Sequence, residues 1–397
     1  MTRAPVPRTA ALLIASLLIG GGAVVFLGGR ITQTGAAPRT TPTGTPLPSG
    51  ATSATIAPTT TASPTPELTS TPIPTLVAAP LTGRMVTEQE AEQHVIAVMV
   101  DDLAPARPQS GLASASIVWQ APAEGGIPRY MMLFQDAVPG DVGPVRSSRY
   151  YFVTWAAEWK AVYAHVGGSP QALAALHKYG AGQWVYNADE FRWGGSFWRI
   201  HTRFAPHNMY TDGKHLRALA AKINADDGPI EPAWRFAPDA LPDARPKGGR
   251  ITTKYLYNTI RYDYDQATNT YLRTVSVEGK EHDANGGERI APKNVVVMVV
   301  RFAPLGDNPT KGRLEADTVA SGTAWIATNG RTIKGTWRKS SVTAPTRFFD
   351  AAGHAVTLTV GQTFVQVMPS ATDVVIKDGT PPSPFTAPAP RSTAVAF

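Results

Sequence analysis

The residues of this 397-residue chain that could carry chemistry lie beside strand ends and glycine turns. Glu124 precedes Gly125-Gly126, and Arg129 follows shortly after. Glycine permits a positive φ or close backbone approach beside the carboxylate. Glu124 could therefore act as a general acid or base, or accept hydrogen bonds from a sugar or peptide. The alternative, equally favoured, is a tight hairpin in which Glu124 and Arg129 form a half-buried ion pair.

Two further carboxylates, Asp101 and Asp102, close the apolar run His94–Asp101, which predicts a buried strand. Because side chains alternate along a strand, one should point inward and the other toward a loop or cleft. Asp101 could then perform acid–base chemistry or bind a cation. The frequency of Asp in turns favours the alternative, in which it caps the next turn and pairs with Arg107.

Arg146 and Arg149 flank Ser147 at the expected start of a helix, where residues three apart share one face. Helix amides and two guanidinium groups would suit a phosphate or carboxylate, and this interpretation is slightly favoured. The alternative is structural pairing with nearby acids, namely Asp136, Asp141 or Glu158.

His165 ends a predicted strand just before Gly167-Gly168-Ser169, which superficially resembles a nucleophile elbow. The pattern fails because Gln171 stands where the second glycine is needed. Ser169 is instead predicted to cap a helix that begins at Pro170.

Two sets of candidate site residues follow. The catalytic candidates are Glu124, His165 and Asp101. The ligand-binding candidates, which include a later histidine that could share a cleft with His165 and Glu124, are Arg107, Arg129, Arg146, Arg149, Ser147, Gly167, Gly168, Arg203, His207 and Asn208. A Gly-rich loop that carries Trp184, Trp193 and Trp198 is predicted as a further binding surface or lid.

Composition excludes several classes of site. The chain has no cysteine, so disulfides, thiolate metal sites, a cysteine nucleophile and a lipobox cysteine are all excluded. No zinc, P-loop or dinucleotide motif is present, and we expect no metal and no cofactor. The formal charge of +7 includes no block of Lys or Arg, which predicts no nucleic-acid partner.

The elements that must position these residues change in type along the chain. Strands are predicted at 94–101, 116–121, 130–135 and 161–165, and helices from 145 to 159, from 170 to 178 and from 212 to 223 with Thr211 as cap. After 249 strands dominate, at 254–262, 271–277, 294–302, 324–328, 332–337, 356–359 and 363–367. The fold class is therefore a mixed α/β (α+β) module followed by an antiparallel β-rich module.

The first 80 residues predict an anchor and a stalk. Residues 10–29 are uncharged and apolar and would span roughly 30 Å as a helix. Two arginines before the run and one after it place the N-terminus in the cytoplasm. The alternative is a cleavable signal peptide, whose apolar core is usually shorter. Of the 50 residues from 31 to 80, 29 are Ser, Thr or Pro, which indicates a disordered stalk.

The predicted organisation is thus a transmembrane anchor or signal at 1–30, a stalk at 31–80, an α/β module at 81–228, a linker at 229–249, a β-rich module at 250–369 and a flexible Pro-rich tail at 370–397. It places a single-pass protein in the cell membrane, with its folded part on the extracytoplasmic side.

Several long motifs occur in a specific order. In the first half they are VMVDDLAPARPQSG (98–111), IVWQAPAEGGIPR (117–129), VGPVRSSRYYF (142–152), YAHVGGSP (163–170) and APHNMY (205–210). In the second half they are Tyr271-Leu-Arg273, His282-Asp283, Asn294–Val297, Trp337, Pro345-Thr-Arg347 and Asp350–Gly353. Together they resemble the two modules of the YerB-like lipoprotein family.

The resemblance implies a mixed α/β sandwich exported to the surface of bacteria, and it implies no particular reaction. The chain departs from the family pattern in two places, with an apolar run in place of the lipidated cysteine and Asp102 where an asparagine is usual. Two functions stay open. The favoured one is binding of peptidoglycan, teichoic acid, peptide or an envelope protein, and the alternative is an envelope hydrolase or transferase that uses Glu124 with His165 or Asp101.

Overall fold

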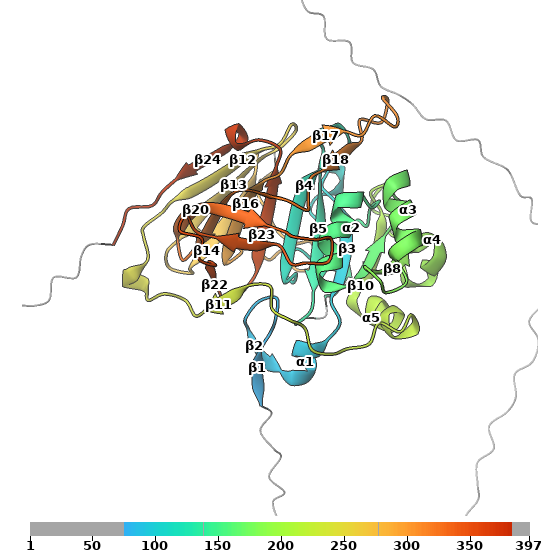
Figure 1. The fold of residues 1–397 in the computed structure, drawn as a ribbon, viewed down its shortest axis with the longest axis horizontal. Coiled ribbons are helices and arrows are strands. Elements are labelled where there is room, and N and C mark those ends of the chain that lie inside the picture. The colour runs from blue at the N-terminus through green and yellow to red at the C-terminus, as the bar shows by residue number, and fades with distance from the viewer. Residues whose placement is uncertain (1–74, 138, 277, 383–397) are drawn as a thin grey trace, which may run out of the picture. The chain divides into compact units, whose positions relative to one another are not determined.

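A mixed sheet of ten strands runs through the centre of the fold (Figure 1). The computed structural model describes residues 75–137, 139–276 and 278–382. In order across the sheet, the strands are β21 (Arg347–Phe349), β20 (Arg331–Arg338), β19 (Ser321–Thr328), β16 (Asn294–Val299), β23 (Thr363–Met368), β4 (Ile117–Pro122), β5 (Pro128–Phe134), β3 (Ile96–Asp101), β7 (Val162–His165) and β8 (Tyr186–Asp189).

The central strands are continuous apolar runs because both faces of this sheet are covered. All six residues of β3 are buried, as are all six of β4 and of β23. β3 pairs in parallel with β7 and antiparallel with β5, which also pairs antiparallel with β4. β23 then pairs in parallel with β4, from Thr363 opposite Ile117 to Gln366 opposite Gln120. This pairing joins the two halves of the chain in one sheet.

A second, antiparallel sheet packs on one face of the first. Its order is β15 (Gly279–Lys280), β14 (Thr270–Val275), β13 (Thr259–Asp265), β12 (Arg250–Lys254) and β24 (Val374–Lys377). Buried and more exposed residues alternate along β12, β13 and β14, as expected for a sheet with one solvated face. The inner residues, which include Ile260 and Tyr262, share a core with Val295 and Phe364 of the large sheet.

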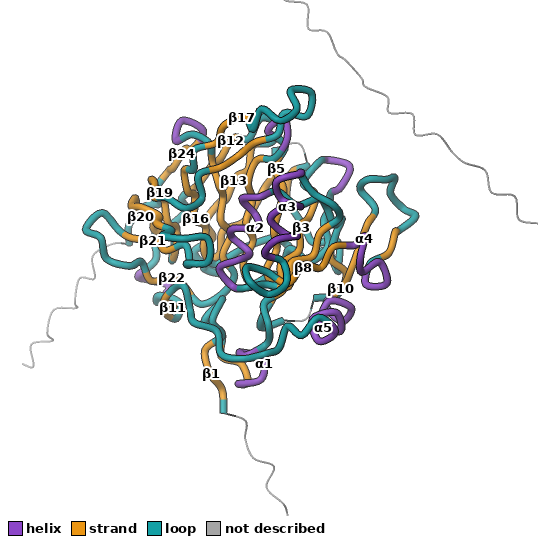
Figure 2. The backbone as a smooth tube through the Cα atoms, turned by 45° about the vertical axis from the view of Figure 1, so that its right-hand side comes forward, coloured by secondary structure: helices purple, strands orange, loops and turns teal. Residues whose placement is uncertain are grey.

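Helices cover the other end of the large sheet (Figure 2). The side chains of α2 (Tyr150–Ala156) and α3 (Pro170–Tyr179) share one core with Met99 and Trp119, whereas those of α5 (Gly213–Lys222) share the opposite core with Val98. The remaining elements are short: β1 (Leu76–Ala78), β2 (Met85–Thr87), α1 (Glu88–Glu92), β6 (Asp141–Val142), α4 (Glu190–Trp193), β9 (Trp198–Arg199), β10 (Met209–Asp212), β11 (Arg235–Ala237), β17 (Phe302–Pro304), β18 (Leu314–Ala316) and β22 (Thr357–Thr359).

The predicted fold class is confirmed, and several element boundaries were wrong. The helix predicted from Val145 begins at Tyr150, because the chain before it is extended and bonds to neighbouring strands: the Arg146 amide donates to the Met99 carbonyl at 2.8 Å. The strand predicted over 254–262 is interrupted by the turn between β12 and β13. Asp212, rather than Thr211, caps α5 through the amide of His215.

Three predicted boundaries also change. The stalk was predicted to reach residue 80, but β1 pairs with β2. The linker predicted at 229–249 contains β11, which pairs with β22, and the buried Trp234. The tail predicted from 370 begins with β24, which pairs with β12. In each case a short stretch pairs with another strand, which is nearby in sequence for β1 and distant for β11 and β24.

The apolar run at 10–29, most of the predicted stalk and the last residues of the tail lie outside the described residues. Within the described residues, no helix has the length and apolar character needed to cross a membrane.

Candidate functional site

Several strand ends meet at one edge of the large sheet. β3 ends at Asp101, directly opposite Arg129 near the start of β5, and β7 ends close by at His165. The extended segment 145–149 crosses this edge: its amides donate to the carbonyls of Met209, Met99 and Gly167. These hydrogen bonds fix the backbone of residues 145–149, and the backbone in turn positions the polar side chains of the segment.

Asp101 binds two basic side chains at this edge. Its Oδ2 lies 2.9 Å from Nε of Arg146 and 2.7 Å from Nδ1 of His207, while Oδ1 accepts a hydrogen bond from the Leu103 amide. The carboxylate is 2% exposed. The two aspartates face different neighbours, because Asp101 binds Arg146 and His207 whereas Asp102 binds Arg107. Asp101 also caps the next turn as expected, but its partner is Arg146 instead of Arg107.

Glu124 lies between two other arginines. It is ion-paired with Arg149, and its Oε2 lies 3.2 Å from Nη2 of Arg129. Gly125 and Gly126 have φ of 61° and 76°, the left-handed conformation that glycine adopts without strain. The predicted half-buried pair between Glu124 and Arg129 is therefore present. Arg149 had been expected to share a helix face with Arg146, but each instead binds a different carboxylate.

We call Asp101, Glu124, Arg129, Arg146, Arg149 and His207 the strand-end arginine site. Three guanidinium groups face two carboxylates, which leaves the site with excess positive charge. Burial lowers the pKa of Arg129 and Arg146, and lowers that of Arg149 to about 10, so all three remain charged at neutral pH.

Part of this donor capacity is unused within the described residues. The buried Nε of Arg149 has no hydrogen-bond partner there. Nε of Arg146, although 2.9 Å from Oδ2 of Asp101, likewise makes no hydrogen bond of good geometry, and the Arg146 side chain is 21% exposed. A buried donor without a partner is costly, and an anion bound beside these groups would supply the missing acceptors.

Exposed apolar side chains lie next to several residues of the strand-end arginine site or to the glycines beside them. We call them the apolar rim: Tyr150, Leu173, Phe191, Phe204, Leu256 and Tyr257, which are between 38% and 92% exposed. A Phe191 ring carbon lies 3.3 Å from where a β-carbon on Gly167 would stand, and Leu256 lies at 3.2 Å from the same position on Gly126. Phe204 precedes His207, and Tyr150 follows Arg149 directly.

Other predicted site residues have structural partners. His165 is fully buried, and its ring nitrogens lie 2.8 Å from the Gly167 carbonyl and from Oδ1 of Asn187. Asn208 accepts from Arg199 at 2.9 Å. Arg203 donates to the carbonyls of Ala106 and Pro108. These residues hold loops in place, and no contact is recorded between His165 and Glu124.

The glycines and serines of the predicted set support the same edge. Ser147 accepts a hydrogen bond from Arg129 through its carbonyl at 2.9 Å. The Gly167 carbonyl accepts from the Ser148 amide, and Gly168 pairs with Ser148 in an isolated bridge. Ser169 caps α3 as predicted, with its hydroxyl accepting from the Ala172 amide.

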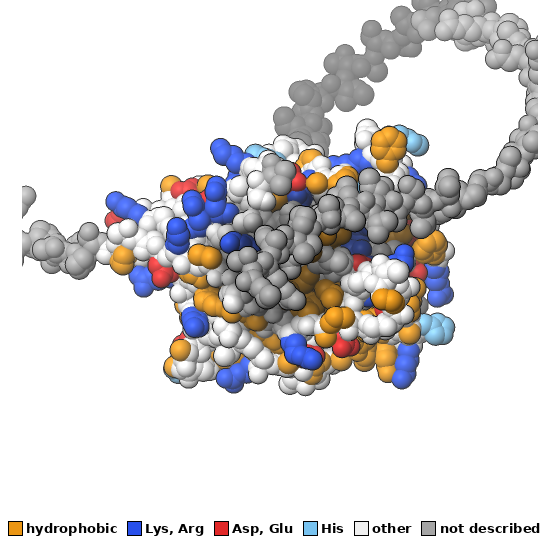
Figure 3. Space-filling model, turned by 90° about the horizontal axis from the view of Figure 1, so that it is seen from above, with side chains coloured by type: hydrophobic (Ala, Val, Ile, Leu, Met, Phe, Trp, Pro, Cys, Tyr) orange, Lys and Arg blue, Asp and Glu red, His pale blue; other side chains and the backbone are white. Residues whose placement is uncertain are grey.

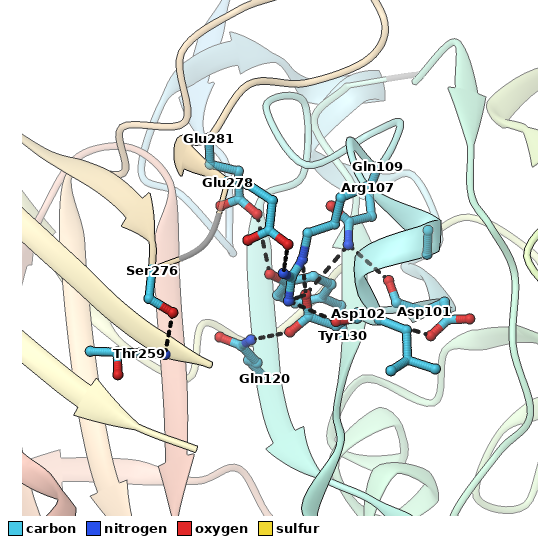
Figure 4. Close-up of polar contacts among 12 residues, drawn as sticks. Asp101, Asp102, Arg107, Gln109, Gln120, Tyr130, Thr259, Ser276, Glu278 and Glu281 are labelled. Atoms are coloured by element: carbon cyan, nitrogen blue, oxygen red, sulfur yellow. Dashed lines mark hydrogen bonds and ion pairs between the residues drawn. The ribbon is translucent and has the colours of Figure 1, made fainter. Parts of the chain in front are cut away.

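Arg107 belongs to a different, buried network (Figure 4). Asp102 accepts from Nε and Nη2 of Arg107 at 3.0 and 2.8 Å and from Gln120 at 2.5 Å. Arg107 also pairs with Glu278 at 2.6 Å. Gln120 in turn accepts from Arg273 of β14, which is ion-paired with Glu281. This network joins the two sheets, so Arg107 is a structural residue in the described geometry.

Sequence reasoning did not anticipate the buried network or the apolar rim.

The three tryptophans of the predicted binding loop have neighbours in the fold. Trp184 stacks on Tyr179 with ring centroids 3.9 Å apart, while Trp193 lies near Lys222 and Trp198 near His215. The strongly exposed aromatic of that loop is Phe191. Within the described residues, no three His, Asp or Glu side chains gather as a metal site would require.

Comparisons with known proteins identify relatives for both halves of the chain. Residues 81–226 match the family described as protein of unknown function (DUF3048), N-terminal domain, and residues 251–365 match its C-terminal domain. The protein named "Putative lipoprotein YerB" from Bacillus subtilis is 32% identical over 268 residues, which cover 66% of this chain and 78% of the relative. The crystal structure of the B. subtilis YerB protein superposes with a TM-score of 0.67 at 25% identity, over 76% of this chain and 100% of that one. The chain therefore belongs to the YerB-like family, as the sequence motifs had indicated.

Proposed function

We propose that this chain is a cell-envelope binding protein whose strand-end arginine site holds a carboxylate or phosphate of a wall polymer, peptide or partner protein. The observation that carries the proposal is the excess of guanidinium groups at a partly open site with an apolar rim. Guanidinium groups bind carboxylate and phosphate oxygens through paired, charge-assisted hydrogen bonds. The rim would contact the non-polar parts of the same ligand.

An envelope location is supported by the relative that is named a lipoprotein. Because this chain has no cysteine, we propose that the apolar run at 10–29 replaces the lipid as a single-pass anchor. The Ser-, Thr- and Pro-rich residues that follow would hold the binding site away from the bilayer. The folded part would then face the extracytoplasmic side.

The geometry favours binding over hydrolysis or group transfer. A general acid or base needs to be within hydrogen-bond reach of the substrate proton. Both oxygens of Glu124 are engaged by arginines, and His165 is buried against Asn187. We therefore infer that Glu124 orders the arginines in the absence of ligand.

The test uses the full-length chain in mild detergent, mixed with isolated bacterial peptidoglycan that retains its teichoic acids. Co-sedimentation measures binding, and mass spectrometry of the supernatant detects released fragments. Arg146→Gln is expected to lower the bound fraction several-fold, because the Arg146 side chain is 21% exposed and those of Arg129 and Arg149 are 9% and 6% exposed. Arg301→Gln is the matched control, since that side chain is 72% exposed and pairs with Asp317 far along the sequence from the site residues.

Sedimentation that is lost with Arg146→Gln and retained with Arg301→Gln would support the proposal. Soluble fragments that disappear with Glu124→Gln would contradict it and establish an envelope enzyme. Equal loss of binding in both arginine variants would show that only overall charge matters, which would also contradict it.

A further inference from the structure

The solvated face of the five-stranded sheet is strongly basic. Alternation along the strands places five cationic side chains on this face, namely Arg250, Lys254, Arg261, Lys280 and Lys377. Two carboxylates, Asp263 and Asp265, lie on the same face. Asp263 is already bound by Arg250 at 2.5 Å and by Arg261 at 2.8 Å. The face therefore carries a net positive charge that its own acids do not neutralise.

The register brings these cations into rows across the strands. Arg250 of β12 lies between Lys377 of β24 and Asp263 of β13, and Thr252 lies beside Arg261 in the next row. Thr274 of β14 pairs with Arg261 on one side and Lys280 on the other. Neighbouring strands are about 4.8 Å apart, so the charges form a band that crosses the whole sheet.

The middle of this face is concave. The hollow on this sheet has a volume of about 480 Å³. Another hollow, of about 610 Å³, lies elsewhere on the molecule, and its lining includes the acidic residues Glu158, Asp226 and Glu231. Among the described residues the lining of the hollow on this sheet combines three cations with four hydroxyls and one valine, and includes no carboxylate: Arg250, Thr252, Thr259, Arg261, Thr274, Ser276, Val375 and Lys377.

We propose that this face binds a linear polyanion with phosphate groups, such as a phosphodiester polymer. Cations in a row with hydroxyl donors between them match repeated phosphate oxygens, which accept both kinds of hydrogen bond. Figure 3 shows Lys and Arg side chains gathered at the end of the molecule where Figure 1 places β12, β13 and β24. The face shares no residue with the strand-end arginine site, so the two proposals stand or fall separately.

A polymer is favoured over an anionic bilayer by the composition of the hollow. Peripheral membrane binding combines basic groups with apolar side chains that enter the headgroup region. The only apolar residue of the described lining is Val375, and three of the five cations, Arg250, Arg261 and Lys377, line a concavity that a flat bilayer does not enter. A narrow, flexible chain of phosphates can follow the band.

The probe is labelled inorganic polyphosphate, titrated with the full-length chain in neutral detergent and followed by fluorescence anisotropy between about 50 and 200 mM salt. Arg261→Gln with Lys377→Gln removes two charges from the band. Lys178→Gln with Lys334→Gln removes two exposed charges elsewhere, on α3 and β20. Circular dichroism verifies that both double variants are folded.

The band variant is expected to bind polyphosphate about tenfold more weakly, while the control pair binds as the wild type does. The slope of log affinity against log salt should fall by about 1.4 for the band variant, since each lost phosphate contact contributes roughly 0.7. No binding of polyphosphate by the wild type would overturn the proposal. Equal weakening in both double variants, or binding to phosphatidylglycerol vesicles in place of polyphosphate, would overturn it as well.

Discussion

At the residue scale, Glu124 occupies the position between Arg129 and Arg149 that the carboxylate of a ligand would take. Its side chain is 23% exposed, and it lies on a turn in which Gly125 and Gly126 both have positive φ. An external anion would therefore compete with Glu124 for the same guanidinium groups. Glu124 would therefore act as an intramolecular competitor of the ligand, and replacing it tests this idea.

Glu124→Gln is expected to strengthen binding of the anionic wall ligand by about three- to tenfold, because the amide keeps the shape and removes the competing charge. The same change should lower the free energy of unfolding by about 2 kcal/mol, since two poorly solvated arginines lose their partner. Binding isotherms and urea unfolding measure the two effects. Glu315→Gln, at an exposed position, should change neither. Weaker binding by Glu124→Gln would contradict the competition model.

The contact between Glu124 and Arg129, which are close in sequence, was predictable from the sequence. The contacts of Arg146 and Arg149 with residues far along the chain were not. Glu124 and Arg129 are close along the chain, so a turn between two strands was enough to pair them. The partners of Arg146 and Arg149 depend on where the segment 145–149 crosses the end of β3, which no local pattern reveals. Most of the apolar rim was missed because residues such as Phe204 and Leu256 have ordinary core residue types, and only the fold shows that they are exposed.

A second residue-scale prediction concerns the buried pair of Glu158 and Lys339. Their charged atoms are 3.0 Å apart, both side chains are fully buried, and Thr346 donates two further hydrogen bonds to the carboxylate. Burial raises the pKa of Glu158 and lowers the pKa of Lys339, so neither charge is favourable alone. Glu158→Ala should lower the free energy of unfolding by about 3 to 5 kcal/mol. Asp317→Ala, which removes an exposed pair, should have no measurable effect in urea unfolding.

At the element scale, the segment 229–249 acts as part of the core rather than as a linker. Trp234 is 7% exposed, donates from its indole nitrogen to the Thr346 carbonyl at 2.9 Å, and packs against Trp159 and Phe348. Its neighbours in β11 pair with β22. The Pro, Asp and Gly content of the segment correctly indicated irregular structure, but composition cannot show that one tryptophan fills a space between distant elements.

Trp234→Ala is therefore expected to lower the free energy of unfolding by about 3 to 5 kcal/mol, the usual cost of removing a large buried aromatic side chain. Leu241→Ala is the control within the same segment, because Leu241 is 77% exposed. Urea titration of the two variants gives the comparison. A change below about 1 kcal/mol for Trp234→Ala would restore the interpretation of this segment as a plain linker.

Strands with a strong local pattern were the predictable elements. The apolar runs of β3, β4 and β7 gave nearly correct boundaries, because a short, continuous apolar run is typical of a buried strand. β24 and β1 are short, and β1 follows a Pro-rich stretch while β24 precedes one, so their strand character comes from pairing with β12 and β2. Tertiary pairing overrides local composition in such cases.

At the scale of the whole molecule, the two family regions do not have separate cores. β23, from the second region, lies between β16 and β4, and β4 belongs to the first. The buried network of Asp102, Gln120 and Arg273 also joins the two regions. Neither region could keep its central strands covered if the other were removed, because the shared sheet would gain an open edge of apolar strands.

We therefore expect the folded part to unfold as one cooperative unit. Tryptophan fluorescence, which reports mainly on residues 119–234, and far-ultraviolet circular dichroism, which reports largely on strands from both regions, should give the same urea midpoint. Residues 75–228 and 229–382, each of which keeps its own strands whole, should each lack native structure when expressed separately, because the parallel pairing of β23 with β4 is lost. Mixing the two fragments could restore that pairing. Two separate transitions, or a fragment that unfolds cooperatively by itself, would show that the continuous sheet joins two independently stable domains.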